Sequence, residues 1–386
     1  MPEAMTGAMT GGDPRRGARA TVRWAVFGAG PVARKFVLGL RQAPGAAATL
    51  VASRDRANAE AFARDLGLAA ADSYEAAARS DAVDAVYIAT PPASHRALAL
   101  ECLAAGKPVL VEKPFAATAE DAEAIAEAAR SAGVFCMEAM WTRFLPLVVH
   151  LKRLVAEGAI GAPSSFSGSF GAATPPEPGS SLFDLAQGGG ALLHRGIYPL
   201  SLACHLLGPA SALQSLARIG PTGVDEDSVL VLRHANGALS SVQASLSSTM
   251  PTDCVIAGTE GMIEVAAPIF RPYRLTLATV PPRGRAGPGH SRGNIRAEAL
   301  KEGHLLQSAQ QRLSGVVGLI RGRRTRRVLR PYAGNGYHYQ AEELMRCVRE
   351  GRTESAVMPL DASLALVRLM DRARAAWGAE PAGGQA

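Results

Sequence analysis

A lysine and a tyrosine in this sequence could act together on an oxygen atom of a substrate. Lys113 precedes Pro114 and directly follows the apolar segment Val109–Glu112, and Tyr198 lies in a second apolar stretch. Reduction of a ketone places negative charge on oxygen, so the site needs a cation and a proton donor beside that atom. An ammonium and a phenol supply both. The alternatives are a surface lysine after a strand and a buried tyrosine with one hydrogen bond.

His194 precedes Tyr198 by four residues, a spacing that places two side chains on one face of a helix. An imidazole normally titrates near about 6.5, so His194 is a third candidate catalytic residue, for proton transfer or substrate binding. The alternative is a packed histidine with satisfied hydrogen bonds. Pro199 could kink the helix and change this projection.

A glycine turn follows the first apolar segment, Thr21–Phe27. Apolar residues recur at helical spacing after the turn, and strand, turn and helix are the context in which G-x-G-x-x-G/A binds a dinucleotide. The first glycine permits the tight turn, the second lets the backbone approach a pyrophosphate, and the helix N-terminus attracts the anion. A turn without ligand is the alternative. The predicted cofactor-binding residues here are Gly28, Ala29, Gly30, Pro31 and Val32.

The end of the second expected strand, Thr49–Ser53, decides between the two nicotinamide cofactors. A Rossmann fold usually places an acid there to bind the ribose 2′-hydroxyl. This sequence has Ser53 and Arg54 instead, which can donate to a 2′-phosphate, and this favours NADP(H) over NAD(H). The alternative is that Arg54 is a solvated loop residue and Asp55 binds the ribose.

Polar residues follow two further expected strands, Ala85–Ala89 and Val109–Glu112. Ligands of parallel sheets bind beyond the carboxyl ends of the strands. A peptide bond before proline can also be cis, which would re-aim Lys113 into the cleft. The remaining predicted cofactor-binding residues are Thr90, Pro91, His95, Glu112 and Lys113.

Strands and helices alternate with short loops as far as a fifth expected strand, Val134–Met137, which predicts a doubly wound parallel sheet. From about Phe144 the rhythm changes to a helix, a strand, a Gly/Pro/Ser-rich loop and an apolar helix that ends at Leu207. Short strands joined by turns then predict a mostly antiparallel sheet, followed by two helices. These later strands are expected at Leu216–Ile219, Ser228–Leu232, Leu239–Leu246, Asp253–Gly258, Met262–Val265 and Tyr273–Ala278.

The predicted fold class is α/β, with an N-terminal Rossmann doubly wound parallel sheet and a C-terminal α+β domain with an open, mostly antiparallel sheet. We expect residues 21–140 to form the NADP-binding domain and residues 141–378 the substrate and oligomerisation domain. Residues 1–20 and 379–386 are expected to be disordered tails.

Composition excludes several classes of protein. The five cysteines are dispersed and the eight histidines form no H-E-x-x-H motif, so we expect no disulfide framework, no metal site and a reducing, cytoplasmic location. No apolar run of 18 residues is present, so no membrane span is expected.

The net charge of +7 is concentrated in one segment. Between Arg283 and Arg330 there are 12 Arg/Lys and 2 Asp/Glu, whereas the rest of the chain has 29 and 32. A nucleic-acid binder would spread its basic surface over the folded domain, so we expect no nucleic-acid partner. Residues 281–330 read as a basic insertion, either a solvated mobile loop or a contact for an anionic surface or partner, with an amphipathic helix possible at Leu305–Ile320.

In combination, several motifs resemble the Gfo/Idh/MocA family (glucose–fructose oxidoreductase, inositol dehydrogenase and rhizopine catabolism proteins). The Gly28–Gly30 turn, Thr90–His95 and Glu112–Pro114 are similar to the family as a whole. Met137–Phe144, Gly188–Pro199 and Gly334–Tyr339 are similar to its dihydrodiol dehydrogenase-like branch. The resemblance implies hydride transfer between a nicotinamide and a secondary alcohol or ketone of a sugar, cyclitol or cyclic diol. It also implies homodimers formed through the C-terminal sheet.

Two residues depart from the pattern that the resemblance implies. An acid usually stands where this sequence has His194, and Arg195 follows it. The first hypothesis is an active NADP(H)-dependent oxidoreductase acting on a small-molecule substrate, because Lys113 and Tyr198 are present. The second is a catalytically impaired NADP-binding protein that acts as a sensor or partner, and His194 is its main support. The third, a nucleic-acid or membrane-associated module, depends on the basic segment alone.

Overall fold

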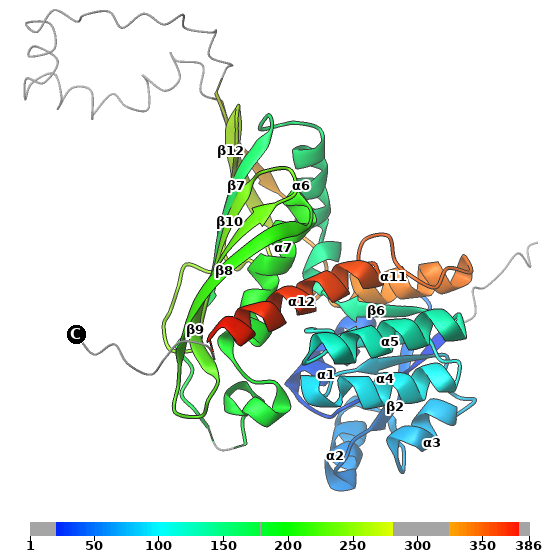
Figure 1. Ribbon diagram of the computed structural model, residues 1–386. Helices are drawn as coiled ribbons and strands as arrows, with labels where there is room; N and C mark the ends of the chain where they lie inside the picture. Colours follow the sequence, from blue (N-terminus) through cyan, green and yellow to red (C-terminus); the bar gives the residue numbers. More distant parts are fainter. Residues whose placement is uncertain (1–20, 178, 281–323, 378–386) are drawn as a thin grey trace, which may run out of the picture.

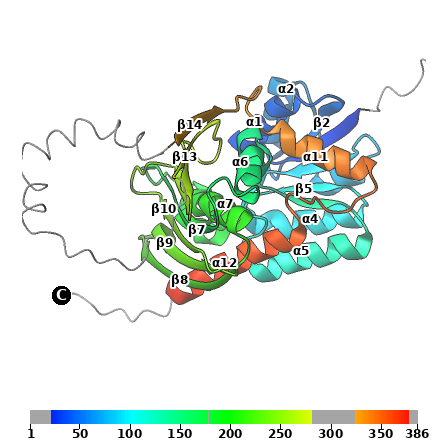
Figure 2. The same cartoon turned by 90° about the horizontal axis from the view of Figure 1, so that it is seen from above.

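The computed structural model describes residues 21–177, 179–280 and 324–377. Its two sheets lie side by side with helices between them (Figures 1 and 2). The expected tails, 1–20 and 379–386, and most of the basic insertion, including Leu305–Ile320, lie outside the described residues.

The first sheet is parallel and has six strands in the order β3-β2-β1-β4-β5-β6. Its central strands are buried runs of apolar residues, as expected for a sheet covered on both faces. The order reverses between β1 and β4, which is where such sheets open a ligand crevice. The strands are β1 Val22–Phe27, β2 Ala46–Ala52, β3 Ala69–Ala70, β4 Ala85–Ile88, β5 Val109–Glu112 and β6 Cys136–Ala139.

Local sequence signals begin and end the helices around this sheet. Thr118 accepts a hydrogen bond from the Asp121 N–H at the start of α5, and Gly133 ends that helix in the left-handed region with φ 63°. The helices are α1 Pro31–Leu40, α2 Arg56–Leu66, α3 Tyr74–Arg79, α4 His95–Ala104 and α5 Ala119–Ala132, with the 3₁₀ turn η1 Pro92–Ser94 before α4.

The second sheet has eight strands in the order β14-β13-β12-β11-β7-β10-β9-β8. Only the β7–β10 pair is parallel, so the expected mostly antiparallel sheet is confirmed. The strands are β7 Pro163–Gly171, β8 Ala210–Ile219, β9 Asp225–His234, β10 Leu239–Ser245, β11 Cys254–Gly258, β12 Gly261–Val265, β13 Arg274–Thr279 and β14 Arg324–Leu329.

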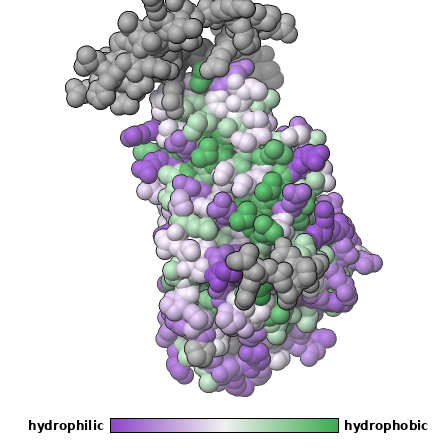
Figure 3. Space-filling view, turned by 60° about the vertical axis from the view of Figure 1, so that its left-hand side comes forward, coloured by the Kyte–Doolittle hydropathy of each residue, from purple (hydrophilic) through white to green (hydrophobic). Residues whose placement is uncertain are grey.

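One face of this sheet packs against helices and the other is open. Figures 1 and 2 show α6 (Pro146–Ala156), α7 (Ile197–Leu207) and α12 (Leu360–Trp377) on the covered face, between the sheet and the first sheet's layer. The space-filling view shows hydrophobic residues among polar ones on the side turned away from these helices (Figure 3). Exposed apolar side chains of β8, β9 and β10 are Leu216, Ile219, Val229, Val231 and Leu239.

The last part of the chain returns to the first sheet's layer. Asn335 donates a hydrogen bond of 2.7 Å to the Lys35 carbonyl on α1, directly before α11 (His338–Arg349). Helix α12 lies along α5, where the Arg368 guanidinium pairs with Glu123 at 2.7 Å. The C-terminal part of the chain is therefore joined to α1 and α5 by contacts between residues that lie far apart in sequence.

Several expectations about secondary structure are wrong in part: β3 is not among the expected strands, and β8 begins at Ala210 instead of the expected Leu216. Arg324–Leu329 belongs to the segment interpreted as a mobile arginine-rich loop, yet it forms β14, because Val328 is buried at the edge of the sheet and the backbone pairs with β13. The fifth expected strand, Val134–Met137, corresponds to β6. It begins two residues later than expected, at Cys136, because the left-handed Gly133 is followed by a short connection.

Candidate active site

The glycine turn after β1 leaves its backbone free for an anion. Gly28 has φ 106°, and a Cβ there would lie 2.7 Å from the Ala89 carbonyl oxygen at the end of β4, so only glycine fits. Gly30 begins α1 with no side-chain cap, and a Cβ on it would meet nothing within 4 Å. Pro31, the first residue of α1, has no N–H, and no side chain caps the N–H groups that follow it, so a phosphate beside Gly30 would be stabilised at this helix end.

At the end of β2, the acid that could compete for the ribose is already used by the fold. Asp55 begins α2 and accepts hydrogen bonds from the N–H groups of Ala57 (2.9 Å) and Asn58 (3.3 Å). The Arg54 side chain is exposed, while its N–H donates to the Tyr74 hydroxyl at 3.1 Å. Arg54 is thus available to a ligand at this strand end, whereas Asp55 acts as a helix cap.

His95 is buried between the ends of β4 and β5. Its Nε2 lies 2.9 Å from the Thr90 carbonyl oxygen and its Nδ1 lies 3.1 Å from that of Pro114. Burial lowers the pKa of this imidazole. Both ring nitrogens face the backbone, so His95 fixes the two strand ends relative to each other, and Thr90 and Pro91 remain at the surface of the crevice.

Lys113 follows β5 and precedes Pro114 through a cis peptide bond, as considered from the sequence. Behind it, Glu112 is buried and accepts hydrogen bonds from the Tyr87 hydroxyl at 2.5 Å and the Lys113 N–H at 3.0 Å. Burial lowers the pKa of Lys113, and the negative charges of Glu112 and Glu138 oppose that effect. These two carboxylates favour the charged ammonium.

The Lys113 side chain reaches the second half of the chain. Its Nζ donates to the His194 carbonyl at 3.1 Å and lies 5.0 Å from the centre of the Tyr198 ring. The three predicted catalytic residues are therefore brought together. The Tyr198 hydroxyl accepts a hydrogen bond of 3.4 Å from Trp141 Nε1, and burial raises its pKa above the usual value of a phenol. A tyrosine in this state is protonated at neutral pH.

His194 lies in a π-turn, Leu192–Gly196 (η5), that runs directly into α7. The irregularity therefore precedes Pro199, which lies in the first turn of α7. Asp225 on β9 holds the start of the turn by accepting a 2.8 Å hydrogen bond from the Leu192 N–H. The His194 Nε2 faces the Gly188 carbonyl at 3.1 Å. Burial and the charge of Lys113 lower the pKa of His194 to about 3, so the ring is neutral at neutral pH.

Tyr198 and four neighbouring aromatic rings form what we call the aromatic cluster. Tyr337 stacks on Trp141 with 4.5 Å between centroids, and Phe170 stacks on Phe270 at 5.0 Å. Tyr198 lies 5.7 Å from Phe170 and 5.9 Å from Phe270. The cluster consists of Trp141, Phe170, Tyr198, Phe270 and Tyr337.

Profiles of known families match both parts of the chain. The profile described as "Oxidoreductase family, NAD-binding Rossmann fold" matches residues 22–140, and "GFO/IDH/MocA C-terminal domain" matches residues 148–264. Trans-1,2-dihydrobenzene-1,2-diol dehydrogenase from Oryctolagus cuniculus is 32% identical over 92% of this chain and 98% of its own length. The enzyme of the same name from Mus musculus is 30% identical over 92% and 97%.

The chain is a member of the Gfo/Idh/MocA oxidoreductase family.

Solved structures show the same fold as this Gfo/Idh/MocA chain. A levoglucosan dehydrogenase in complex with NADH and levoglucosan has a TM-score of 0.75 at 22% identity, covering 92% of this chain and 98% of that one. A 3-ketoreductase from Actinomadura kijaniata in complex with NADP and TDP-benzene has a TM-score of 0.72 at 23% identity, covering 92% and 97%.

Several residues of this Gfo/Idh/MocA site were not assigned a role from the sequence. Trp141 and Tyr337 lie in motifs that carried the family resemblance, and an aromatic residue within a matched motif was an available signal. Phe170 and Phe270 carry no sequence signal, because only the fold brings β7 and the turn after β12 beside Tyr198. Glu138 is buried and accepts a 3.1 Å hydrogen bond from the Phe115 N–H, which links β6 to the turn that carries Lys113.

Among the described residues, no group of three or more His, Cys, Asp or Glu side chains is placed to hold a metal ion. In the same residues, no helix is long and apolar enough to cross a membrane.

The neutral state of His194 gives a testable prediction. Between about pH 5 and 8, we expect the wild-type protein and His194→Gln to show the same ionisations in their pH–rate profiles, because the imidazole is already deprotonated in this range. The unfolded chain's imidazole titrates near about 6.5. Between that pH and the native pKa, the unfolded state binds more protons, so acidification destabilises the protein.

In His194→Gln, the free energy of unfolding should therefore decrease less steeply as the pH falls. The slope should differ from that of the wild-type protein by at most about 1.4 kcal/mol per pH unit. Denaturant titrations at several pH values measure this slope. His205 is a control, because burial lowers its pKa to about 3 as well. His205→Gln should flatten the stability slope and leave the pH–rate profile unchanged. An ionisation near pH 6.5 that is lost only in His194→Gln would contradict the prediction.

Proposed function

We propose that this chain is an NADP(H)-dependent oxidoreductase that transfers a hydride between the nicotinamide and a secondary alcohol or ketone of a sugar, cyclitol or cyclic diol. The observation that carries the proposal is the position of the Lys113 ammonium, 5.0 Å from the Tyr198 ring and 3.1 Å from the His194 carbonyl oxygen. It lies at the carboxyl end of β5, on the edge of the sheet where the nucleotide turn opens. Names of relatives that act on a cyclic diol or on sugars support the substrate class.

In the proposed mechanism, Lys113 and Tyr198 act on the substrate oxygen. Bound nicotinamide supplies or accepts the hydride. During reduction, the Lys113 ammonium stabilises the developing negative charge on oxygen. The Tyr198 phenol, kept protonated by burial, donates the proton to that oxygen and is protonated again from solvent. Oxidation is the reverse of these steps: Tyr198 first loses its proton to solvent and then, as phenolate, accepts the proton of the alcohol. His194 is neutral and adjacent, and its carbonyl oxygen orients the ammonium.

Cofactor binding is proposed at the strand ends of the first sheet. The uncapped first turn of α1 fits a pyrophosphate, since no side chain occupies the space beside Gly30. Thr90, Pro91 and Glu112 lie at neighbouring strand ends, and His95 holds those ends together. Ser53 and Arg54 are proposed to bind the 2′-phosphate of NADP(H), because Asp55 is engaged as a helix cap.

A second candidate function is a catalytically impaired NADP-binding sensor. The specific observation that favours it is the neutral, half-buried His194 in place of the family's usual acid. An active site that binds cofactor but turns over no alcohol or ketone would establish this alternative.

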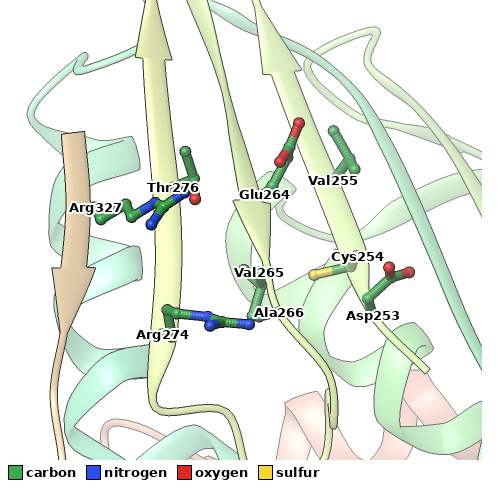
Figure 4. Close-up of a pocket in the computed structure, with 9 residues that line it drawn as sticks. All are labelled: Asp253, Cys254, Val255, Glu264, Val265, Ala266, Arg274, Thr276 and Arg327. Atoms are coloured by element: carbon green, nitrogen blue, oxygen red, sulfur yellow. The ribbon is translucent and has the colours of Figure 1, made fainter. Parts of the chain in front are cut away.

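We propose a cytoplasmic homodimer formed through the open face of the second sheet. All five cysteines are free, which suits a reducing compartment. The open face combines apolar side chains of β8 and β9 with charged groups of β12, β13 and β14. On this open face, Glu264, Arg274 and Arg327 line a pocket of about 330 Å³ (Figure 4). A face that bears both signs of charge and apolar residues can pair with its own copy around a two-fold axis.

Catalysis is tested by replacing the two reacting groups. Lys113→Met and Tyr198→Phe should each reduce turnover at least about a hundredfold, because each removes an electrostatic or proton-transfer group. Cofactor binding, followed by nicotinamide fluorescence, should change little. The assay follows NADPH oxidation and NADP reduction with keto-sugars, inosones and cyclic diols. Lys107→Met is the control, since the Lys107 ammonium donates hydrogen bonds to the Ser80 and Val83 carbonyls, away from the site. Full turnover in either variant would remove that residue from the mechanism.

Cofactor preference is tested by replacing Arg54. NADPH should bind at least several-fold more tightly than NADH, and Arg54→Ala should remove most of that difference, because a guanidinium pairs with a phosphate but not with a hydroxyl. Asp55→Ala is the matched control. It should lower stability by about 1 kcal/mol through loss of the helix cap and retain the preference. Equal affinities in the wild-type protein would contradict the 2′-phosphate role.

The dimer is tested by placing charge on the open face. Val231→Asp should shift the protein from dimer to monomer in analytical ultracentrifugation, because an unpaired carboxylate would be buried in the interface. Val149→Asp is the control, since Val149 is equally exposed but lies on α6, on the covered side of the sheet. A monomeric wild-type protein would refute the proposal.

A further inference from the structure

Arg195 is a buried cation. The residue is 8% exposed, and within residues 21–177, 179–280 and 324–377 it forms no ion pair with a carboxylate. Burial lowers its pKa, and no acid is close enough to raise it. Arg143 shows the contrast: burial lowers its pKa to about 10, but Glu138 opposes that effect. Placing a guanidinium in such a position costs free energy unless an anion completes the environment.

Neutral groups fix the Arg195 side chain in place. Its Nη1 donates to the carbonyls of Ala172 and Ser245, and its Nη2 donates to the Thr174 hydroxyl at 2.5 Å. Three of its five N–H donors are used in this way. The Nε–H and one Nη2–H have no partner among the described residues. A guanidinium with two free donors can bind a carboxylate in a bidentate pair.

Arg195 and Lys113 stand beside the same aromatic cluster. The Arg195 guanidinium lies 5.8 Å from the centre of the Phe170 ring, and the Lys113 ammonium lies 5.0 Å from that of Tyr198. The two rings are 5.7 Å apart. Arg271 adds a third cation at 5.8 Å from the Phe270 ring. The positive charge of Arg195 also acts on Lys113 and His194, whose pKa values it lowers.

We propose that Arg195 gives this site a substrate class: ring compounds that carry a carboxylate in addition to the hydroxyl or carbonyl group that reacts. The inference rests on the proposed function, because it assigns Lys113 and Tyr198 to the reacting oxygen. Arg195 binds the carboxylate, and the half-buried Phe170 and Phe270 rings contact the apolar part of the ring compound. Because His194 is neutral where the family usually has an acid, no negative charge at that position repels the substrate.

The experiment compares two ring ketones of similar shape, one with a carboxylate and one with a neutral carboxamide in the same position. With NADPH, the rates of reduction of 3-oxocyclohexane-1-carboxylate and 3-oxocyclohexane-1-carboxamide are measured for the wild-type protein and for Arg195→Leu. We expect kcat/KM to favour the carboxylate by about tenfold or more in the wild-type protein, the scale of a charge-assisted bidentate pair. Arg195→Leu should reduce this ratio to near one. Taking the ratio within each variant cancels losses common to both substrates.

Two further variants separate charge from loop structure. Thr174→Val breaks one hydrogen bond of Arg195 but keeps its charge, and it should retain the preference for the carboxylate. Arg195→Gln keeps hydrogen-bonding capacity without charge, and this variant should lose the preference for the carboxylate. The test therefore stands even if Arg195→Leu does not fold. A ratio near one in the wild-type protein, or a ratio unchanged in Arg195→Leu and Arg195→Gln, would overturn the inference.

A binding measurement separates this inference from the proposed function. Cyclohexanecarboxylate and cyclohexanecarboxamide are titrated into the protein with NADPH by calorimetry. Tighter binding of the carboxylate in the wild-type protein, lost in Arg195→Gln, supports the role of Arg195 even if neither ketone is reduced, in which case the proposed function fails. Reduction of both ketones with no preference in rate or binding refutes the role of Arg195 and leaves the proposed function intact.

Discussion

The proposed mechanism needs the ammonium group of Lys113 to carry charge at a position where burial disfavours charge. Glu112 and Glu138 compensate from behind, and the His194 carbonyl accepts a hydrogen bond in front. Each compensating group comes from a different element, so the charge state of one side chain depends on β5, β6 and the π-turn before α7 being in place together. Both carboxylates are themselves buried, and burial raises the pKa of each, that of Glu138 to about 7. The electrostatic interactions between these buried groups are thus finely balanced, as is general for buried charges.

The surrounding fold limits how far this arrangement can move. His95 connects the ends of β4 and β5 through backbone carbonyls, and Asp225 holds the first N–H of the π-turn. A π-turn shifts the helical register by one residue, and such turns are frequent at functional sites. Here the π-turn lets the His194 carbonyl accept a hydrogen bond from Lys113 while the face of the Tyr198 ring remains beside the same ammonium group. The parallel sheet supplies Lys113 and the two carboxylates behind it, whereas the π-turn and α7 supply the His194 carbonyl and Tyr198.

The sequence predicted those parts of the site that local chemistry determines. The glycine turn, the strand ends and the lysine before proline follow from residue type and spacing, and the fold class and family are confirmed. Strand β14 was missed because its charged residues read as a solvated loop, although Val328 is buried. The neutral His194 could not be predicted, because its pKa depends on burial by distant elements. Phe170 and Phe270 meet only through the tertiary fold.

The late return of the chain to its beginning has a consequence for biosynthesis. Tyr337 stacks on Trp141 in the aromatic cluster, and Asn335 donates to the Lys35 carbonyl on α1. During translation the N-terminal sheet emerges first and can fold as a unit. The aromatic cluster, however, is completed only after Tyr337 has left the ribosome. A nascent chain that stops before Tyr337 would therefore contain the glycine turn of the first sheet and an incomplete aromatic cluster around Tyr198.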